Sequence, residues 1–340
     1  MCLNCSLSTD CHTRFNVSRL GLVAPILEGC IRDPLFLKQI VVPCTQNPIN
    51  EHIYVNDVAN HRTLEWVKNL PGTMSSRVEL GRRNGTTYAF IKKPMIGGKS
   101  LLYEACIHQM VKESLTRGHF PRGAAAVYDV FKIQDGSICF SMEVFADAVP
   151  LNILLQSYKG SMTTLILEIL LQLCAMLWHL SMDLGMNHRD LKPSNLMIEE
   201  HAACPLTLKV GSQSVTIQSR YTISLIDFGF SCIGNADTRV SDIAIGGVYP
   251  VTDPCPKDGR DLFMFLAFLY MDCGALIGPD LKACFGKWLQ NGSTGILGKI
   301  DKIGHDFEQW VYFITGSDRI TKFECHPMNL FQDLLKLPKV

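Results

Sequence analysis

Hydrophobic and polar residues alternate along the first half of the chain and follow a helical period along the second half. The alternating runs, which predict strands, are Ser76–Arg83, Thr86–Lys92, Ala125–Lys132 and Ser137–Phe145. Asn84-Gly85 joins the first pair of runs, and Asp135-Gly136 joins the second pair. Because Asn, Asp and Gly tolerate the positive φ of tight turns, these dipeptides predict two β-hairpins.

Apolar residues with helical spacing predict a helix from Ser100 to about Leu115. Further helices are predicted over 162–184, 259–272, 279–290 and 304–315. A strand-rich part followed by a helical part predicts an α+β protein with two unequal lobes. The predicted division is an N-terminal extension over 1–60, a strand-rich lobe over 61–145 and a helical lobe over 146–340.

The composition narrows the class of protein. A chain of 340 residues with 47% hydrophobic residues can form a large core in two lobes. The 32 basic and 32 acidic side chains balance, which argues against a nucleic-acid partner. The 14 cysteines are spread along the chain without a leader sequence, so we expect reduced thiols in an intracellular protein of the cytoplasm or nucleus. Polar residues interrupt the most apolar helix, so no integral membrane association is expected.

Two short stretches carry the strongest chemical signal. The first is His188-Arg189-Asp190-Leu191-Lys192-Pro193-Ser194-Asn195, and the second is Asp227-Phe228-Gly229. Phosphoryl transfer from ATP needs a carboxylate that orients the attacking hydroxyl and oxygen ligands that hold Mg²⁺ on the phosphates. Asp190 fits the first role, and Asn195 and Asp227 fit the second. Lys192 is placed to support the transferred phosphoryl group.

These stretches resemble the H-R-D-L-x-x-x-N and D-F-G motifs of the eukaryotic-type protein kinase family, with no substitution. The resemblance covers about residues 65–335 and implies a bilobal kinase fold, with a small β-rich N-lobe and a larger α-helical C-lobe. It also implies ATP, Mg²⁺ and a protein substrate. Lys192 is typical of serine/threonine kinases, so the predicted reaction transfers the γ-phosphate of Mg-ATP to Ser or Thr hydroxyls.

The resemblance implies a lysine on the third strand that holds the ATP phosphates, paired with a glutamate on the following helix. Lys92 in Ala89-Phe90-Ile91-Lys92 is the predicted lysine, and Lys93 is the alternative. Only one of the two faces the nucleotide, because successive side chains of a strand point to opposite faces. Glu104 is the predicted partner, and Glu113 stays open as an alternative.

Other ATP-binding positions follow from the same resemblance. Gly72 lies in the segment that corresponds to the glycine-rich loop, which here has one glycine where the family has three. Val78 is expected above the adenine. The Glu143 carbonyl and the Val144 amide are the expected hinge contacts to the base.

Two departures from the family concern the C-terminal part. Thr207–Val210 and Val215–Ile217 predict an inserted hairpin, and no A-P-E motif follows Asp227. Both features resemble kinases of large DNA viruses more than cellular ones. The missing motif leaves Asp253 as a substitute partner for Arg319, and Asp261 is expected to anchor the catalytic loop.

Arg189 precedes the predicted catalytic aspartate, and in kinases such an arginine pairs with a phosphate on the activation segment. The hydroxyls available there are Ser231, Thr238, Ser241 and Thr252. Two other functions compete with an active protein kinase: a pseudokinase that serves as a nucleotide-binding or protein-interaction scaffold, and a phosphotransferase for small molecules. The degraded glycine-rich loop favours the scaffold, whereas the intact set of Lys, Asp, Asn and Asp side chains opposes it.

Overall fold

The computed structural model describes residues 41–43, 53–57, 62–70, 76–233, 253, 256–290 and 295–337. The chain is a mixed α/β protein with two compact units. Within the described ranges, unit 1 comprises the residues up to Glu113 together with Ala125–Ala146, and unit 2 comprises Ser114–Ala124 and everything from Asp147 onward. The boundary between the units therefore falls within helix α4 (Leu102–Arg117).

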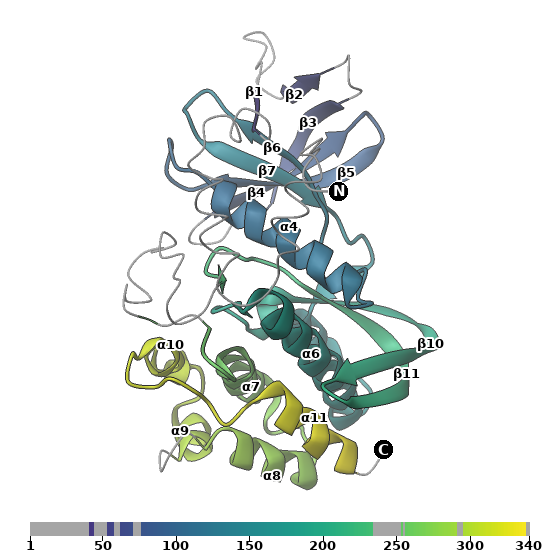
Figure 1. Ribbon diagram of the computed structural model, residues 1–340, viewed down its shortest axis with the longest axis vertical. Helices are drawn as coiled ribbons and strands as arrows, with labels where there is room; N and C mark the ends of the chain where they lie inside the picture. Colours follow the sequence, from purple (N-terminus) through teal and green to yellow (C-terminus); the bar gives the residue numbers. More distant parts are fainter. Residues whose placement is uncertain are drawn as a thin grey trace. The chain divides into compact units, whose positions relative to one another are not determined.

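Unit 1 is built on a seven-stranded sheet in the order β1-β6-β7-β5-β4-β3-β2 (Figure 1). All neighbouring strands are antiparallel except β1 and β6. The strands are β1 (Val41–Pro43), β2 (Ile53–Asp57), β3 (Arg62–Asn69), β4 (Ser76–Arg83), β5 (Thr87–Pro94), β6 (Val127–Lys132) and β7 (Ile138–Glu143). The two predicted hairpins are the pairs β4–β5 and β6–β7. Asn84 and Gly85 both have positive φ, as the turn prediction requires.

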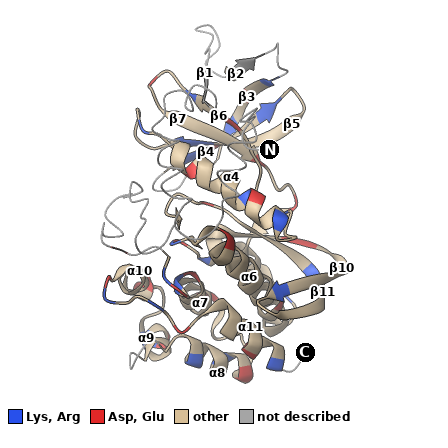
Figure 2. Ribbon diagram, in the orientation of Figure 1, with Lys and Arg blue, Asp and Glu red and all other residues tan. Residues whose placement is uncertain are grey.

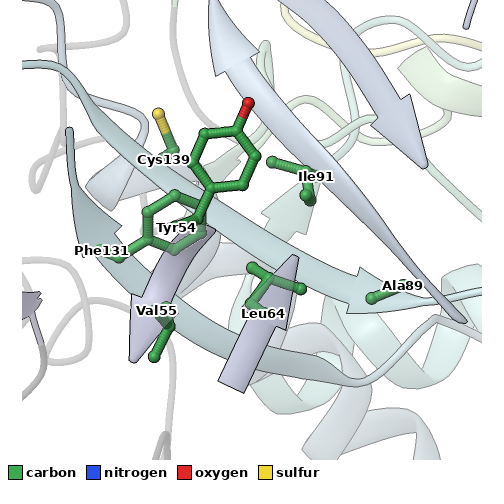
Figure 3. Close-up of a cluster of buried hydrophobic side chains, with 7 residues drawn as sticks. All are labelled: Tyr54, Val55, Leu64, Ala89, Ile91, Phe131 and Cys139. Carbon is green, nitrogen blue, oxygen red and sulfur yellow. The ribbon is translucent and has the colours of Figure 1, made fainter. Parts of the chain in front are cut away.

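One core cluster of unit 1 lies on a face of this sheet (Figure 3). It contains side chains from five strands, namely Tyr54, Val55, Leu64, Ala89, Ile91, Phe131 and Cys139. Ala89 and Ile91 are two residues apart on β5, so they point to the same face. Burial of this face fixes the register of β5, because a slip by one residue would move both side chains to the opposite face, which carries Lys92.

The predicted boundary at residue 60 is wrong for the sheet. Strand β2 pairs with β3, and its Tyr54 and Val55 belong to the buried cluster of Figure 3. The short run Ile53-Tyr54-Val55 has too few alternating positions to be separated from the irregular sequence around it. Part of the predicted extension therefore completes the sheet of unit 1.

Unit 2 contains most of the helices. Its elements are β8 (Ala148–Pro150), α5 (Leu151–Ser157), α6 (Met162–Leu184), β9 (Met186–Asn187), η2 (Pro193–Asn195), β10 (Leu196–Val210), β11 (Gln213–Leu225), β12 (Cys232–Ile233), α7 (Arg260–Cys273), α8 (Pro279–Trp288), α9 (Ile296–Ile303), η3 (Gly304–Phe307), α10 (Glu308–Gly316) and α11 (Pro327–Lys336). Helix α6 begins where the Ser161 hydroxyl accepts from the Thr164 amide and ends at Gly185 with φ of 57°. The predicted helices over 162–184, 259–272, 279–290 and 304–315 correspond to α6, α7, α8 and the η3–α10 pair.

The inserted hairpin is longer than predicted. Strands β10 and β11 pair in antiparallel register from Leu196–Leu225 to Val210–Gln213, with one irregularity between Glu200 and Cys204. At the tip of the hairpin, exposed residues alternate with less exposed ones. The sequence therefore predicts strands only at the tip. The near end pairs with β8, so the hairpin is continuous with the body of unit 2.

Helix α6 meets the length and apolarity of a membrane-spanning helix, and it is the only helix in the described ranges that does. It is tan along most of its length in Figure 2, which means that it carries few charged residues. However, 67% of its most apolar window is buried in the structure. The Gln172 side chain donates to the Tyr221 carbonyl at 2.9 Å and to the Ser219 hydroxyl at 3.2 Å. In this structure α6 is the core helix of unit 2.

The cysteines differ from the expectation at one position. Seven of those that the structure describes are free, and five of these seven are buried. Burial raises the pKa of the Cys174 and Cys273 thiols, which keeps them protonated at neutral pH. Cys232 in β12 is disulfide-bonded. The expectation of reduced thiols throughout is therefore wrong for Cys232, because composition does not reveal which thiols approach each other.

Candidate functional site

A buried carboxylate fixes the backbone of the segment that carries the predicted catalytic residues. Asp261, at the start of α7, accepts from the His188 amide at 2.8 Å and from the Arg189 amide at 2.9 Å. Arg189 has φ of 68°, a left-handed conformation that a non-glycine residue keeps only when its surroundings hold it. The prediction that Asp261 anchors this loop agrees with these contacts.

The Asp190 carboxylate lies at the centre of the segment and is 5% exposed. Its Oδ2 accepts from Asn195 Nδ2 at 3.0 Å and pairs with Lys192 Nζ at 3.1 Å. Its Oδ1 accepts from the hydroxyl of Tyr312 on α10 at 2.6 Å. Asp190, Lys192 and Asn195 are therefore brought together as predicted, and Tyr312 joins them without any signal in the sequence.

The hairpin of β10 and β11 brings Asp227 to the same region of unit 2. Leu196 pairs with Leu225, and the Ile226 amide donates to the Asn195 carbonyl at 3.2 Å. Asp227 follows directly and has φ of 64°, the second left-handed backbone in the predicted site. The adjacent Phe228 is buried and packs against the His188 ring at a centroid distance of 5.2 Å.

The oxygen donors of this region fit a magnesium ion. Asn195 turns its amide nitrogen toward Asp190, so its amide oxygen is the atom that can ligate a metal. Asp227 contributes a carboxylate, and Mg²⁺ prefers one or two such oxygens together with substrate phosphates. Among the described residues, no group of three or more His, Cys, Asp or Glu side chains is arranged to hold a metal ion.

Unit 1 contains the predicted lysine and glutamate. Lys92 Nζ lies 2.5 Å from Glu104 Oε1, and both side chains are buried. Lys93 instead bonds Glu79 at 2.8 Å and the Tyr54 hydroxyl at 2.8 Å. The alternation of side chains on β5 therefore selects Lys92 as the partner of the helix α4 glutamate.

The contacts of the alternative Glu113 and of the other residues predicted to bind ATP do not test their roles. Glu113 accepts from Gln109 one turn earlier on α4 at 2.8 Å. Val78 on β4 and Val144 after β7 are half-buried, and Gly72 lies outside the described residues. Glu143 ends β7, where its amide donates to the Ala126 carbonyl at 2.8 Å. The roles of these four residues toward a nucleotide stay predictions.

Three cations converge on the buried carboxylate of Asp253. Arg189 reaches Oδ2 at 2.5 Å, and Oδ1 is 2.5 Å from Lys257 Nζ and 2.7 Å from Arg260. The side chains of Asp253, Lys257 and Arg260 have no exposed surface. The sequence shows the chain positions of these residues but not that four ionic side chains share one buried site.

This cluster changes two predictions. Arg189, expected to pair with a phosphorylated hydroxyl, here pairs with Asp253. Of the four candidate hydroxyls, Ser231 is buried and donates to the His188 carbonyl at 3.2 Å, and the other three lie outside the described residues. Arg260 is the arginine of α7 that bonds Asp253, whereas Arg319 was expected to do so. The role of a phosphate on the activation segment stays a prediction.

Lys257 should make the stability of the protein depend on pH. Burial, aided by the Arg260 charge, lowers the pKa of Lys257 from its ordinary 10.5 to about 8. Between these two values the unfolded chain binds more protons than the folded chain, so the free energy of unfolding rises with pH. The slope from this group is at most about 1.4 kcal/mol per pH unit.

The measurement is urea denaturation from pH 7 to pH 10 for the wild type and Lys257→Met. The free energy of unfolding of the wild type, minus that of the variant, should increase with pH above about 8. Lys336→Met removes a lysine whose side chain is 74% exposed and should keep the wild-type slope. A wild-type slope identical to that of Lys257→Met would contradict the assignment.

Comparison with known proteins adds a family. Residues 102–244 match the family model described as poxvirus serine/threonine protein kinase. The matched range includes Glu104, the segment from His188 to Asn195, and Asp227. The resemblance to serine/threonine kinases, and to those of large DNA viruses, is thereby confirmed for this part of the chain. No curated protein matches the chain.

Proposed function

We propose that the chain is an ATP-dependent protein kinase that phosphorylates Ser or Thr hydroxyls of protein substrates. The observation that carries the proposal is the arrangement of Asp190, Lys192 and Asn195 on a loop whose backbone is fixed by Asp261. The match of residues 102–244 to a kinase family supports it. In this proposal units 1 and 2 correspond to the N-lobe and C-lobe of a bilobal kinase.

Unit 1 supplies the phosphate-binding chemistry in this proposal. Glu104 fixes Lys92 Nζ at 2.5 Å, so the ammonium group is oriented before ATP arrives. A buried lysine is retained in its charged form by such a partner, and that charge then balances the α- and β-phosphates. The Lys92–Glu104 pair buried in unit 1 is a feature that a purely structural β-sheet does not require, because buried ion pairs contribute little to stability.

Unit 2 supplies the transfer step. Asp190 accepts a hydrogen bond from the substrate hydroxyl and takes its proton as the new bond to phosphorus forms and the bond to the β-phosphate oxygen breaks. Lys192, 3.1 Å from the carboxylate, balances the charge of the phosphoryl group in transit. Bound through Asn195 and Asp227, Mg²⁺ would neutralise the phosphate oxygens.

The competing function is a pseudokinase that binds nucleotide or a partner protein without catalysis. It draws support from the single glycine at Gly72, since a loop with few glycines covers phosphates less closely. Against it, Lys92, Asp190, Asn195 and Asp227 are all present. A scaffold does not catalyse phosphoryl transfer and so has no catalytic need for these four side chains.

Incubation of the protein with labelled ATP, Mg²⁺ and a generic basic protein tests the proposal, with Lys92→Met as the informative variant. Loss of the phosphate contact should lower kcat/KM roughly 100-fold or more, as loss of one charged transition-state contact does elsewhere. Lys93→Met is the matched control on the same strand. Because Lys93 bonds Glu79 and Tyr54, it should lower the melting temperature but keep the transfer rate of the folded protein.

Two outcomes would contradict the proposal. Equal label incorporation by Lys92→Met and the wild type would show that Lys92 takes no part in the reaction. A wild type that binds ATP but transfers no label under any of these conditions would favour the pseudokinase.

A further inference from the structure

The hydroxyl of Tyr312 occupies the one carboxylate oxygen of Asp190 that the catalytic loop itself does not bind. Asn195 and Lys192 both contact Oδ2, whereas Oδ1 accepts from Tyr312 at 2.6 Å. Lys192 Nζ also donates to the Tyr312 oxygen at 3.0 Å. The hydroxyl thus lies between the predicted base and the lysine predicted to support the phosphoryl group.

This geometry is that of an acceptor hydroxyl. A group that loses its proton to a general base lies about 2.6–3.2 Å from the base before reaction, and the distance from Tyr312 to Asp190 lies at the short end of that range. A substrate hydroxyl needs the same oxygen and the same side of the carboxylate. Tyr312 and a substrate therefore compete for one position.

The structure holds Tyr312 in this position from several directions. Its ring packs edge-on against Phe268 of α7 at a centroid distance of 5.7 Å. The buried Lys257 bonds the Thr315 and Ser317 carbonyls at 3.1 and 2.7 Å, which fixes the C-terminal end of α10. Tyr312 is half-buried, while Trp310 and Phe313 on the same helix are 55% and 69% exposed. The Tyr312 side chain is therefore packed into unit 2, unlike its aromatic neighbours.

We propose that Tyr312 is a positioning residue that masks Asp190 and that it must release the carboxylate before a substrate hydroxyl is oriented. The inference rests on the proposed kinase function and adds a specificity element to it. Only a substrate that displaces the phenol gains access to the base, so acceptors that bind weakly around α10 are rejected. Water is rejected in the same way, which limits hydrolysis of ATP in the absence of substrate.

The test is steady-state phosphorylation of a generic basic protein by Tyr312→Phe, with kcat and the acceptor KM measured separately. Removal of the competing hydroxyl should lower the acceptor KM roughly 10-fold, because a hydrogen bond to a charged group contributes at least that factor. The kcat should not fall, and ATP hydrolysis without acceptor should rise. Phe313→Leu, an exposed change one residue away, should match the wild type.

The opposite result would show that Tyr312 helps catalysis by orienting Asp190. In that case kcat falls for Tyr312→Phe while the acceptor KM stays constant, and the proposal is overturned. Unchanged kinetics would overturn it as well. If Tyr312→Phe folds poorly, Tyr312→Leu also removes the hydroxyl and should shift the acceptor KM in the same direction.

Asp190→Asn separates this inference from the proposed function. Suppose that the wild type transfers more label than Asp190→Asn but Tyr312→Phe transfers no more than the wild type. The masking role alone is then overturned. If neither the wild type nor Tyr312→Phe exceeds Asp190→Asn, the kinase function itself fails. Activity that appears only in Tyr312→Phe supports both.

Discussion

Asp190→Asn is expected to lower kcat for phosphoryl transfer about 1000-fold, within the range that a positioned general base contributes. The change removes the negative charge but keeps the size of the side chain. An amide at position 190 can place its oxygen where Oδ2 accepts from Asn195 and its nitrogen where it can donate to the Tyr312 oxygen, so the loop should keep its structure. The loss then measures the chemistry of the carboxylate and not the collapse of its surroundings.

The measurement is single-turnover transfer from labelled ATP at saturating acceptor, combined with a melting curve for each variant. Asp280→Asn is the matched control, because Asp280 is an exposed carboxylate in the first turn of α8. It should transfer label at the wild-type rate. If Asp190→Asn retained a tenth or more of the wild-type kcat, Asp190 would not be the catalytic base.

The local sequence was sufficient to predict that the proposed catalytic residues lie together, because they are close neighbours in the chain. Asp190, Lys192 and Asn195 lie within six residues, so their spacing alone places them around one point. The choice of Lys92 over Lys93 required the register of β5, which the sequence left open. Once the strand is formed, alternation of side chains decides between the two.

Contacts between residues distant in the chain could not be predicted. Tyr312 lies 122 residues from Asp190, and a tyrosine in an amphipathic helix has no feature that distinguishes a catalytic neighbour from a surface residue. Asp253 was predicted as a substitute for a missing glutamate, yet its actual partners are Arg189, Lys257 and Arg260. Charge pairing depends on which elements pack together, and the sequence does not encode that pairing locally.

Strand length limited the prediction of the fold in a different way. Strand β2 has five residues, two of which face the cluster of Figure 3, and so short a run carries little periodic signal. The long strand β10 was missed over most of its length because Glu199, Glu200 and the exposed stretch from Ala202 to Pro205 break the alternation of apolar and polar residues. Both strands are defined by their partners in the sheet more than by their own sequence.

Asp253→Ala is expected to lower the free energy of unfolding by about 3–5 kcal/mol, the typical cost of removing one partner from a buried ion pair. The effect arises because Arg189 and Arg260 would keep their charges without a carboxylate beside them, and Lys257, whose pKa is already lowered to about 8, would lose its proton. A typical protein has only about 5–15 kcal/mol of stability, so the loss is a large share of the total. This loss of stability should be larger than the loss caused by any substitution of an exposed residue in unit 2.

Urea denaturation at pH 7 of Asp253→Ala, Asp253→Asn and Asp258→Ala gives the comparison. Asp258 is exposed and five residues farther along the chain, so its removal should change the free energy of unfolding by less than about 0.5 kcal/mol. Asp253→Asn keeps the shape and one acceptor oxygen but loses the charge and turns an amide nitrogen toward a cation, and it should lie between the other two variants. A loss below about 1 kcal/mol for Asp253→Ala would mean that the three cations do not depend on this carboxylate. The contacts of Lys257 with the Thr315 and Ser317 carbonyls would then be the main support of the site, and α10 would hold Tyr312 over Asp190 without any help from Asp253.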